Sequence, residues 1–213
     1  MSIIALNEVS AVVLAGGKSR RMAGTDKLTL EFGGSTLLDR TIKNLSSQTK
    51  LVLLNSNNDA AAKEALGTQN ITVVRDHCAG NAGPLDGIVS TMEWLRAHAP
   101  NCKWLLTAPV DCPFLPTNLL QALMAGLEKP SVNEVKIVLP TNGENKHYAC
   151  ALWATELALP ARTFLDNGGR AIREFIRSQA SIEVSFGSTE KDPFFNINTP
   201  EDYQLALKLL VSE

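Results

Sequence analysis

The sequence contains few of the residues that build metal centres and disulfide frameworks. Only 4 of its 213 residues are cysteine and 3 are histidine. They are scattered along the chain as Cys78, Cys102, Cys112, Cys150, His77, His98 and His147. No CxxC pair and no spacing typical of zinc ligands occurs among them. We therefore expect reduced and mostly buried thiols, and no site built from protein nitrogen and sulfur ligands.

Long hydrophobic runs and a strong net charge are absent as well. No stretch approaches the roughly 20 apolar residues that span a bilayer, and residues 1–7 lack the features of a signal peptide. The formal net charge is −2, without the broad basic face that binds nucleic acid. We therefore expect a cytoplasmic protein with no membrane or nucleic-acid partner. With 45% hydrophobic residues the chain can bury a core, which predicts one domain over residues 1–213.

Apolar runs alternate with helical patterns through the first half of the chain. The pattern predicts strands at residues 9–15, 51–54, 71–74 and 104–107, and helices around residues 38–45, 59–66, 85–95 and 119–127. Such alternation is typical of α/β proteins. It predicts a Rossmann-like, mostly parallel sheet with helices on both faces.

The second half is less regular and favours a mixed extension of the sheet. Strands are expected at residues 135–139, 148–153 and 182–186, and a helix carrying Ile172 follows a glycine pair. The segment from Thr199 reads TPED. A capping threonine, a proline at the first position and acids in the first turn predict that a helix begins there.

A glycine-rich basic loop follows the first strand. Residues 11–27 read AVVLAGGKSRRMAGTDK, which matches neither the P-loop nor the dinucleotide fingerprint. The loop holds one acid, Asp26, and four basic residues, Lys18, Arg20, Arg21 and Lys27. At a strand's carboxyl end, Gly16 and Gly17 let the backbone approach a phosphate. The alternative is a strand-to-helix turn with a solvated basic loop, but the clustered charge favours a phosphate site.

Three other strand ends carry polar side chains. Asp111, in APVDCPF, is placed to bind Mg²⁺ together with substrate phosphates, or to cap the next helix or close an Asx turn. Asp76 begins a glycine-rich stretch that reaches the next helix near Asp86. It either takes part in a nucleotide or metal site or belongs to a long turn. Asn55 either bonds a ribose hydroxyl or favours a turn.

Together these segments resemble a known family. LAGGKSRRMAGTDK is similar to the LAGGxSxRMGxxDK signature of the GT-A-like nucleotidyltransferases. The segments DHCAGNAGPLDG, APVDCPFLP and FFNINTPEDY match further family blocks in the expected order. From Val9 to about Leu207, the chain most resembles the molybdenum cofactor guanylyltransferases, the MobA-type branch.

The resemblance implies a GT-A-type fold and an enzyme. Such an enzyme joins GMP from GTP to the terminal phosphate of molybdopterin bearing molybdenum, releases pyrophosphate and uses Mg²⁺. The implied partners are GTP, the molybdopterin cofactor, cofactor-insertion proteins and apo-molybdoenzymes.

The resemblance also implies roles for individual residues. The nucleotide-binding turn corresponds to Leu14, Ala15, Gly16 and Gly17. Lys27 contacts phosphates, Asn55 and Asp76 help to hold GTP, and Asp111 binds Mg²⁺ beside the α-phosphate. Arg20 and Arg21 steady the triphosphate or the incoming phosphate, and are counted with Lys27 and Asp111 as catalytic. Asn196 and Asn198 lie on the pterin side.

Two departures from the family pattern and two rival functions remain open. Ala23 stands where a glycine is usual, and His147-Tyr148 stands where several members have His-Pro, which leaves the role of His147 open. One rival is a related nucleotidyltransferase that uses CTP or another acceptor. The other is a non-enzymatic nucleotide-binding partner in cofactor delivery.

Overall fold

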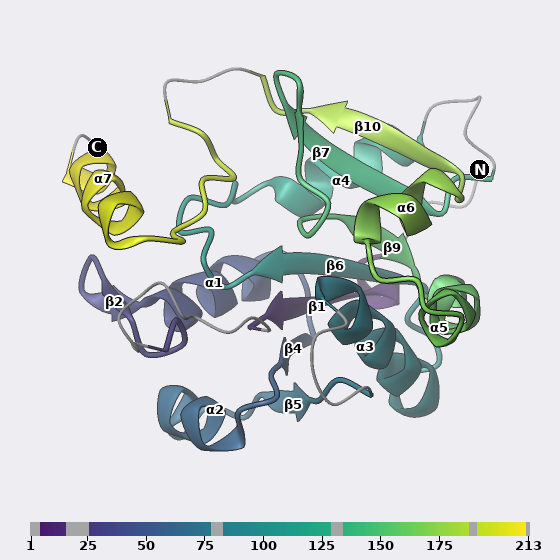
Figure 1. The fold of residues 1–213 in the computed structure, drawn as a ribbon, viewed down its shortest axis with the longest axis horizontal. Helices are drawn as coiled ribbons and strands as arrows, with labels where there is room; N and C mark the ends of the chain where they lie inside the picture. Colours follow the sequence, from purple (N-terminus) through teal and green to yellow (C-terminus); the bar gives the residue numbers. More distant parts are fainter. Residues whose placement is uncertain (1–4, 16–25, 78–82, 129–133, 188–190, 212–213) are drawn as a thin grey trace.

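The structure is a computed structural model that describes residues 5–15, 26–77, 83–128, 134–187 and 191–211. Its centre is an eight-stranded sheet (Figure 1). The sheet strands are β1 (Val9–Leu14), β4 (Val52–Asn55), β5 (Thr72–Val74), β6 (Trp104–Pro109), β7 (Ile137–Asn142), β8 (Asn145–Lys146), β9 (Leu152–Ala154) and β10 (Ser181–Ser185). Their order is β10-β7-β9-β6-β1-β4-β5, and β8 pairs with β7.

The sheet is mostly parallel, with an antiparallel strand in the middle. β1 pairs in parallel with β4 and β6, β4 with β5, and β10 with β7. β9 is antiparallel to both β6 and β7. The expectation of a parallel first half and a mixed second half is therefore confirmed.

Helices cover both faces of this sheet. Among the described residues they are α1 (Leu37–Ser46), α2 (Asp59–Leu66), α3 (Pro84–His98), α4 (Leu119–Leu127), α5 (Ala158–Asp166), α6 (Ile172–Arg177) and α7 (Pro200–Val211). Buried residues of α1, α2, α4 and α7 form one core, and those of α3, α5 and α6 form the other. No described helix is both long enough and apolar enough to cross a membrane.

The first strand shows why the sheet needs cover on both sides. All six residues of β1 are buried. Val9, Ala11 and Val13 belong to one core, whereas Val12 and Leu14 belong to the other. Because successive side chains of a strand point to opposite faces, a continuous apolar run requires an apolar layer above and below it.

Four parallel strands end in register at one edge. Leu14 at the end of β1 pairs with Pro109 of β6 on one side and with Asn55 of β4 on the other. Asn55 in turn pairs with Val74, the last residue of β5. The segments that leave these strands therefore begin along one line, which is the carboxyl edge where open α/β sheets bind ligands.

Two elements differ from the sequence-based expectation. The strand expected over residues 148–153 exists only as β9, because Cys150 N–H donates to the carbonyl of His147 at 3.0 Å and the preceding residues form a turn. Helix α5 was not expected at all. It carries Pro160 in its first turn, where a missing N–H leaves no intrahelical hydrogen bond unmade.

A small hairpin was also missed. It consists of β2 (Glu31–Phe32) and β3 (Ser35–Thr36), joined by two glycines with positive φ, Gly33 at 62° and Gly34 at 86°. Positive φ at both turn residues is what the type I′ turn of a two-residue hairpin requires, so the glycine pair was an available signal. The Tyr203 hydroxyl donates to the carbonyl of Glu31 at 2.8 Å, which ties the hairpin to α7.

Gly126 of α4 packs closely against β10. A Cβ atom there would lie 2.7 Å from Cγ2 of Val184 and 3.3 Å from Cδ1 of Ile182. Replacing a helical glycine by alanine normally stabilises by about 1 kcal/mol. Here the added methyl group overpacks the interface, which costs about 1–3 kcal/mol.

We expect Gly126→Ala to lower the free energy of unfolding by roughly 1 kcal/mol, because the overpacking cost exceeds the gain in helix propensity. Urea unfolding followed by circular dichroism measures the change. Val184→Ala makes room for the methyl group, so in a double-mutant cycle the added change Gly126→Ala should cost less in the Val184→Ala background than in the wild type. A single variant more stable than the wild type would contradict this packing.

Candidate active site

Three polar side chains meet at the carboxyl edge of the sheet. The Lys27 ammonium donates to Oδ2 of Asp111 at 2.5 Å and to Oδ1 of Asn198 at 3.1 Å. The side chains of Lys27 and Asp111 are 19% and 17% exposed, so the ion pair is shielded but reachable from solvent. Asp111 and Asn198, which lie 84 and 171 positions after Lys27 in the sequence, thus share one cluster with it.

A turn organised by Asp26 presents Lys27. The Asp26 carboxylate accepts the N–H of Leu28 at 3.0 Å, and its carbonyl accepts the N–H of Thr29 at 3.2 Å. Asn58 donates to the other carboxylate oxygen at 3.2 Å. Leu28 is buried with 1% exposure. An Asx-type turn and a buried neighbour therefore fix the backbone on which the lysine stands.

The β6 strand and its continuation position Asp111. The N–H of Val110 donates to the carbonyl of Leu14 at 3.0 Å, which extends the pairing one residue beyond the strand. The N–H of Ile197 then donates to the carbonyl of Asp111 at 2.9 Å. The late segment of the chain is thereby attached to the Asp111 loop. Helix α4 begins later, with Asn118 at its N-cap, so capping of that helix by Asp111 was the wrong alternative.

A capping box at the start of α7 orients Asn198. The Asp202 carboxylate accepts the N–H groups of Asn198 and Thr199, each at 2.9 Å, and Asp202 N–H donates to the Thr199 hydroxyl at 3.1 Å. The predicted helix start is confirmed. The reciprocal cap also fixes the residue just before the helix, so that the Asn198 amide meets the lysine.

Asn196 lies beside the same cluster. It is exposed, and its Oδ1 accepts a hydrogen bond from the Cys112 thiol at 2.7 Å. A hydrogen bond between the Cys112 thiol and Cys150, together with burial, raises the pKa of Cys112 well above its ordinary value, so the thiol is a neutral donor near pH 7. Cys102, Cys112 and Cys150 are free and buried, as expected for reduced thiols.

Asn55 and Asp76 form a second cluster along the edge. The Asn55 amide donates to the carbonyl of Val74 at 3.1 Å and to Oδ1 of Asp76 at 2.9 Å. Asn57 donates to Oδ2 of Asp76 at 2.7 Å. A Cβ atom on Gly87 would lie 2.1 Å from the Asn55 amide oxygen, so the start of α3 packs directly on it. Asn55 is 3% exposed, and its amide holds the more accessible Asp76 carboxylate.

The turn that was expected to bind the nucleotide is described only in part. Leu14 ends β1, and the N–H of Ala15 donates to the carbonyl of Asn55 at 2.9 Å, which keeps this turn at the edge. Gly16, Gly17, Arg20 and Arg21 lie outside the described residues. Sequence reasoning assigned no role in the site to Asp26, Asn57 or Asp202, although the turn and cap preferences of aspartate and asparagine are a usable signal.

The oxygen donors of this site suit a hard cation. Within the described ranges, no group of three histidine, cysteine or acidic residues could hold a metal ion. Asp111 and Asn198 nevertheless direct two oxygens at one positive group, the Lys27 ammonium. One carboxylate and one amide oxygen suit Mg²⁺, which completes its coordination with phosphates and water.

Comparison with known proteins agrees with this architecture. Residues 11–182 match the MobA-like NTP transferase domain. The chain belongs to the MobA-like NTP transferase family. A molybdenum cofactor guanylyltransferase from Mesorhizobium japonicum is 36% identical over 209 residues, which cover 96% of this chain and 97% of that relative. One from Rhodopseudomonas palustris is 36% identical over 205 residues, covering 95% and 94%.

Solved structures share the MobA-like fold. Molybdopterin-guanine dinucleotide biosynthesis protein A from Archaeoglobus fulgidus has a TM-score of 0.74 and 20% identity, covering 96% of this chain and all of that one. A nucleotidyl transferase from Methanothermobacter thermautotrophicus has a TM-score of 0.70 and 20% identity, covering 97% of this chain and all of that one. At this identity the likeness shows the fold alone, and it confirms the predicted fold class.

His147 packs on the segment that precedes Asn196 in this MobA-like chain. Its ring stacks on Phe194, with centroids 4.3 Å apart. Its Nε2 is buried and has no hydrogen-bond partner among the described residues. Burial lowers the pKa of His147 below its ordinary value of 6.5, and Asp192 opposes this shift. The histidine is therefore mainly neutral in the folded protein.

The lowered pKa of His147 predicts that stability falls in acid. The unfolded chain takes up this proton at a higher pH than the folded protein, so the contribution is present above about pH 6.5 and is lost as the pH falls below that value. Chemical unfolding at a series of pH values measures it. His147→Phe keeps the stack and removes the titrating group, so its unfolding free energy should fall less between pH 7 and 5. Equal slopes for the two proteins would contradict the assignment.

Proposed function

We propose that the protein is a molybdenum cofactor guanylyltransferase, which transfers GMP from GTP to molybdopterin bearing molybdenum and releases pyrophosphate. Relatives of that name are 36% identical over nearly the whole chain. The structural observation that carries the proposal is the contact of Lys27 with Asp111 and Asn198 at the carboxyl edge. A cation and an oxygen-donor set stand together there, as transfer from a triphosphate requires.

The transfer needs positioning and charge stabilisation. An oxygen of the acceptor's terminal phosphate forms a bond to the α-phosphorus of GTP, and the bond from that phosphorus to pyrophosphate breaks. Lys27 offers its ammonium to the phosphate oxygens, and Asn198 orients that ammonium through the 3.1 Å contact. Holding both reactants in line removes much of the entropic barrier, so no protein nucleophile is needed.

Mg²⁺ belongs to this proposal. Asp111, assisted by the amide oxygen of Asn198, would hold it together with the substrate phosphates. When bound, the ion offsets the negative charge that the triphosphate carries. Lys27 and Asp111 neutralise each other in the structure. A metal–nucleotide complex offers each of them a new partner of opposite charge, the phosphates for Lys27 and the cation for Asp111.

The remaining predicted residues extend the site on both sides. Leu14 to Gly17 supply the backbone turn around the nucleotide, and Asp76, held by Asn55, helps to bind GTP. Arg20 and Arg21 steady the triphosphate or the incoming phosphate. Asn196 and Asn198 serve the pterin side, a placement supported by their exposed position at the cluster.

We propose the cytoplasm as the working compartment, and cofactor-insertion proteins and apo-molybdoenzymes as the partners that receive the product. The three described cysteines are free and buried, which suits a reducing compartment. A dinucleotide cofactor is useful only after transfer to an acceptor protein, and this supports the proposal of cofactor-insertion proteins and apo-molybdoenzymes as partners.

A nucleotide panel tests the proposed function. Purified protein is incubated with GTP, CTP, ATP or UTP and Mg²⁺, with and without molybdopterin bearing molybdenum, and pyrophosphate is measured. We expect release that depends on the acceptor and is fastest with GTP. Faster release with CTP would reject GTP as the substrate. GTP binding without pyrophosphate release would instead indicate a non-enzymatic nucleotide-binding protein.

Removal of the Asp111 charge tests the chemistry directly. We expect Asp111→Asn to slow pyrophosphate release by about 100-fold or more, as loss of one group that stabilises transition-state charge does. Circular dichroism should show an intact fold, because the carboxylate lies at the edge rather than in a core. Asp166→Asn, an exposed carboxylate at the end of α5, is the matched control and should keep wild-type rates. Comparable turnover by the two variants would remove Asp111 from the mechanism.

A further inference from the structure

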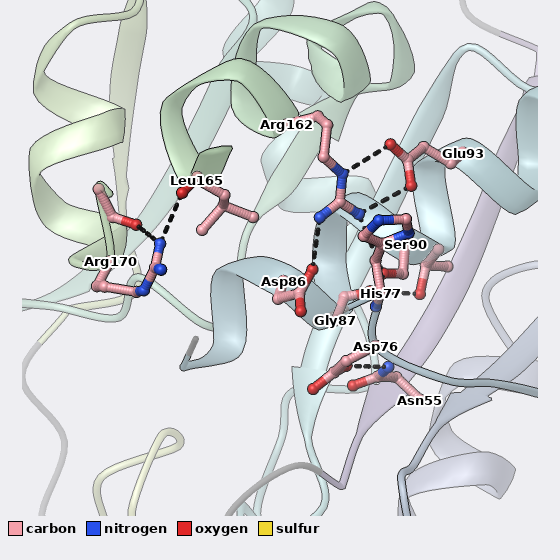
Figure 2. Close-up of polar contacts among 12 residues, drawn as sticks. Asn55, Asp76, His77, Asp86, Gly87, Ser90, Glu93, Arg162, Leu165 and Arg170 are labelled. Carbon is pink, nitrogen blue, oxygen red and sulfur yellow. Dashed lines mark hydrogen bonds and ion pairs between the residues drawn. The ribbon is translucent and has the colours of Figure 1, made fainter. Parts of the chain in front are cut away.

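A buried arginine joins α5 to three residues of α3. Arg162 donates through Nη1 to Asp86 at 2.9 Å, through Nε and Nη2 to the two carboxylate oxygens of Glu93 at 3.0 and 2.9 Å, and through Nη2 to the Ser90 hydroxyl at 3.4 Å. Figure 2 shows this guanidinium between the two carboxylates and the hydroxyl. The planar group thus spans the first turns of α3 as a single brace.

The charged groups of this brace are buried, so folding has to remove them from water. Asp86 has 0% exposure and Arg162 has 9%. A buried ion pair is weak evidence for stability, because an apolar pair of the same shape often serves as well. What the charged pair adds is a fixed geometry between two helices, since the fork accepts few arrangements of its partners.

The brace continues to the nucleotide edge. Ser90, which Arg162 contacts, also accepts the backbone N–H of His77 at 3.0 Å. His77 directly follows Asp76, whose carboxylate is held by Asn55. Figure 2 draws Arg162, Ser90, His77, Asp76 and Asn55 close together, with Asn55 bonded to Asp76.

A second path reaches the same place through the helix itself. Arg162 holds Asp86, and the next residue, Gly87, packs on the Asn55 amide with no room for a side chain. Both paths end on the pair formed by Asn55 and Asp76. A shift in the first turn of α3 would therefore also move the Asp76 carboxylate.

We infer that Arg162 is a positioning residue for GTP: it holds Asp76 and the first turn of α3 at the nucleotide edge and thereby sets the affinity for GTP rather than the rate of transfer. The inference rests on the proposed function, which puts GTP at this edge. Arg162 itself is buried and lies behind the site, so it acts through Ser90 and Asp86.

The test separates KM from kcat. GTP is titrated in the pyrophosphate assay against wild type, Arg162→Met, Arg162→Lys and Ser90→Ala. We expect both Arg162 variants to raise the KM for GTP by about tenfold, the effect of losing one or two net hydrogen bonds, while kcat stays within about threefold. Ser90→Ala should also raise the KM for GTP, because the backbone N–H of His77 loses the hydroxyl that accepts its hydrogen bond.

Two comparisons distinguish positioning from loss of stability. Arg162→Lys keeps a charge beside Asp86 but cannot reach Ser90 and Glu93 together, so it should recover thermal stability relative to Arg162→Met without recovering KM. Leu123→Ala, a core variant on α4 with 0% exposure, supplies matched destabilisation on the other face of the sheet and should leave KM unchanged.

The outcomes are distinguishable from failure of the proposed function. If wild type turns over GTP but the Arg162 and Ser90 variants keep KM within about twofold, the positioning role is wrong. It is equally wrong if Leu123→Ala raises KM as much, or if kcat falls while KM stays constant. A wild-type protein that neither binds GTP nor releases pyrophosphate would contradict the proposed function itself.

Discussion

The register between four parallel strands is the constraint on which the rest of the site depends. β6, β1, β4 and β5 end together at Pro109, Leu14, Asn55 and Val74. The register is strongly determined because β1 is buried on both faces, and a slip of one residue would exchange the sets of side chains in the two cores. Hydrophobic packing thus fixes where the polar strand ends meet, and of these polar residues Asn55 is itself buried against the start of α3.

In the proposed function, the charges at this edge serve binding rather than stability. The side chains of Lys27 and Asp111 are largely buried, and a buried ion pair is weak evidence for stability because desolvation offsets the attraction. The backbone beneath it is held by other interactions, namely the turn at Asp26 and the cap at Asp202. These local hydrogen bonds order the site independently of the two charges, which stay available to a triphosphate and a cation.

Much of the fold could be predicted because local patterns and tertiary packing agree in the first half of the chain. The boundaries of α2 and the cap at Thr199 followed from spacing and residue type. The missed elements lack such agreement. Helix α5 was missed because it contains Pro160, and proline usually argues against a helix. Strand β9 is short because the residues before it form a turn. A three-residue strand has too few positions to show a period.

The sequence by itself determined the alternation of strands and helices, and it singled out Lys27 in the glycine-rich basic loop and Asp111 after the fourth predicted strand as candidate site residues. Apolar periodicity and turn chemistry are local, so they can be read from neighbours in the chain. Only the tertiary structure decided that Asn198 contacts Lys27 beside Asp111, that Asn55 holds the Asp76 carboxylate, and that Arg162 braces α3. Each of these contacts joins groups from segments that are far apart in the sequence. The packing of the two cores, rather than any local preference, determines which of these segments meet.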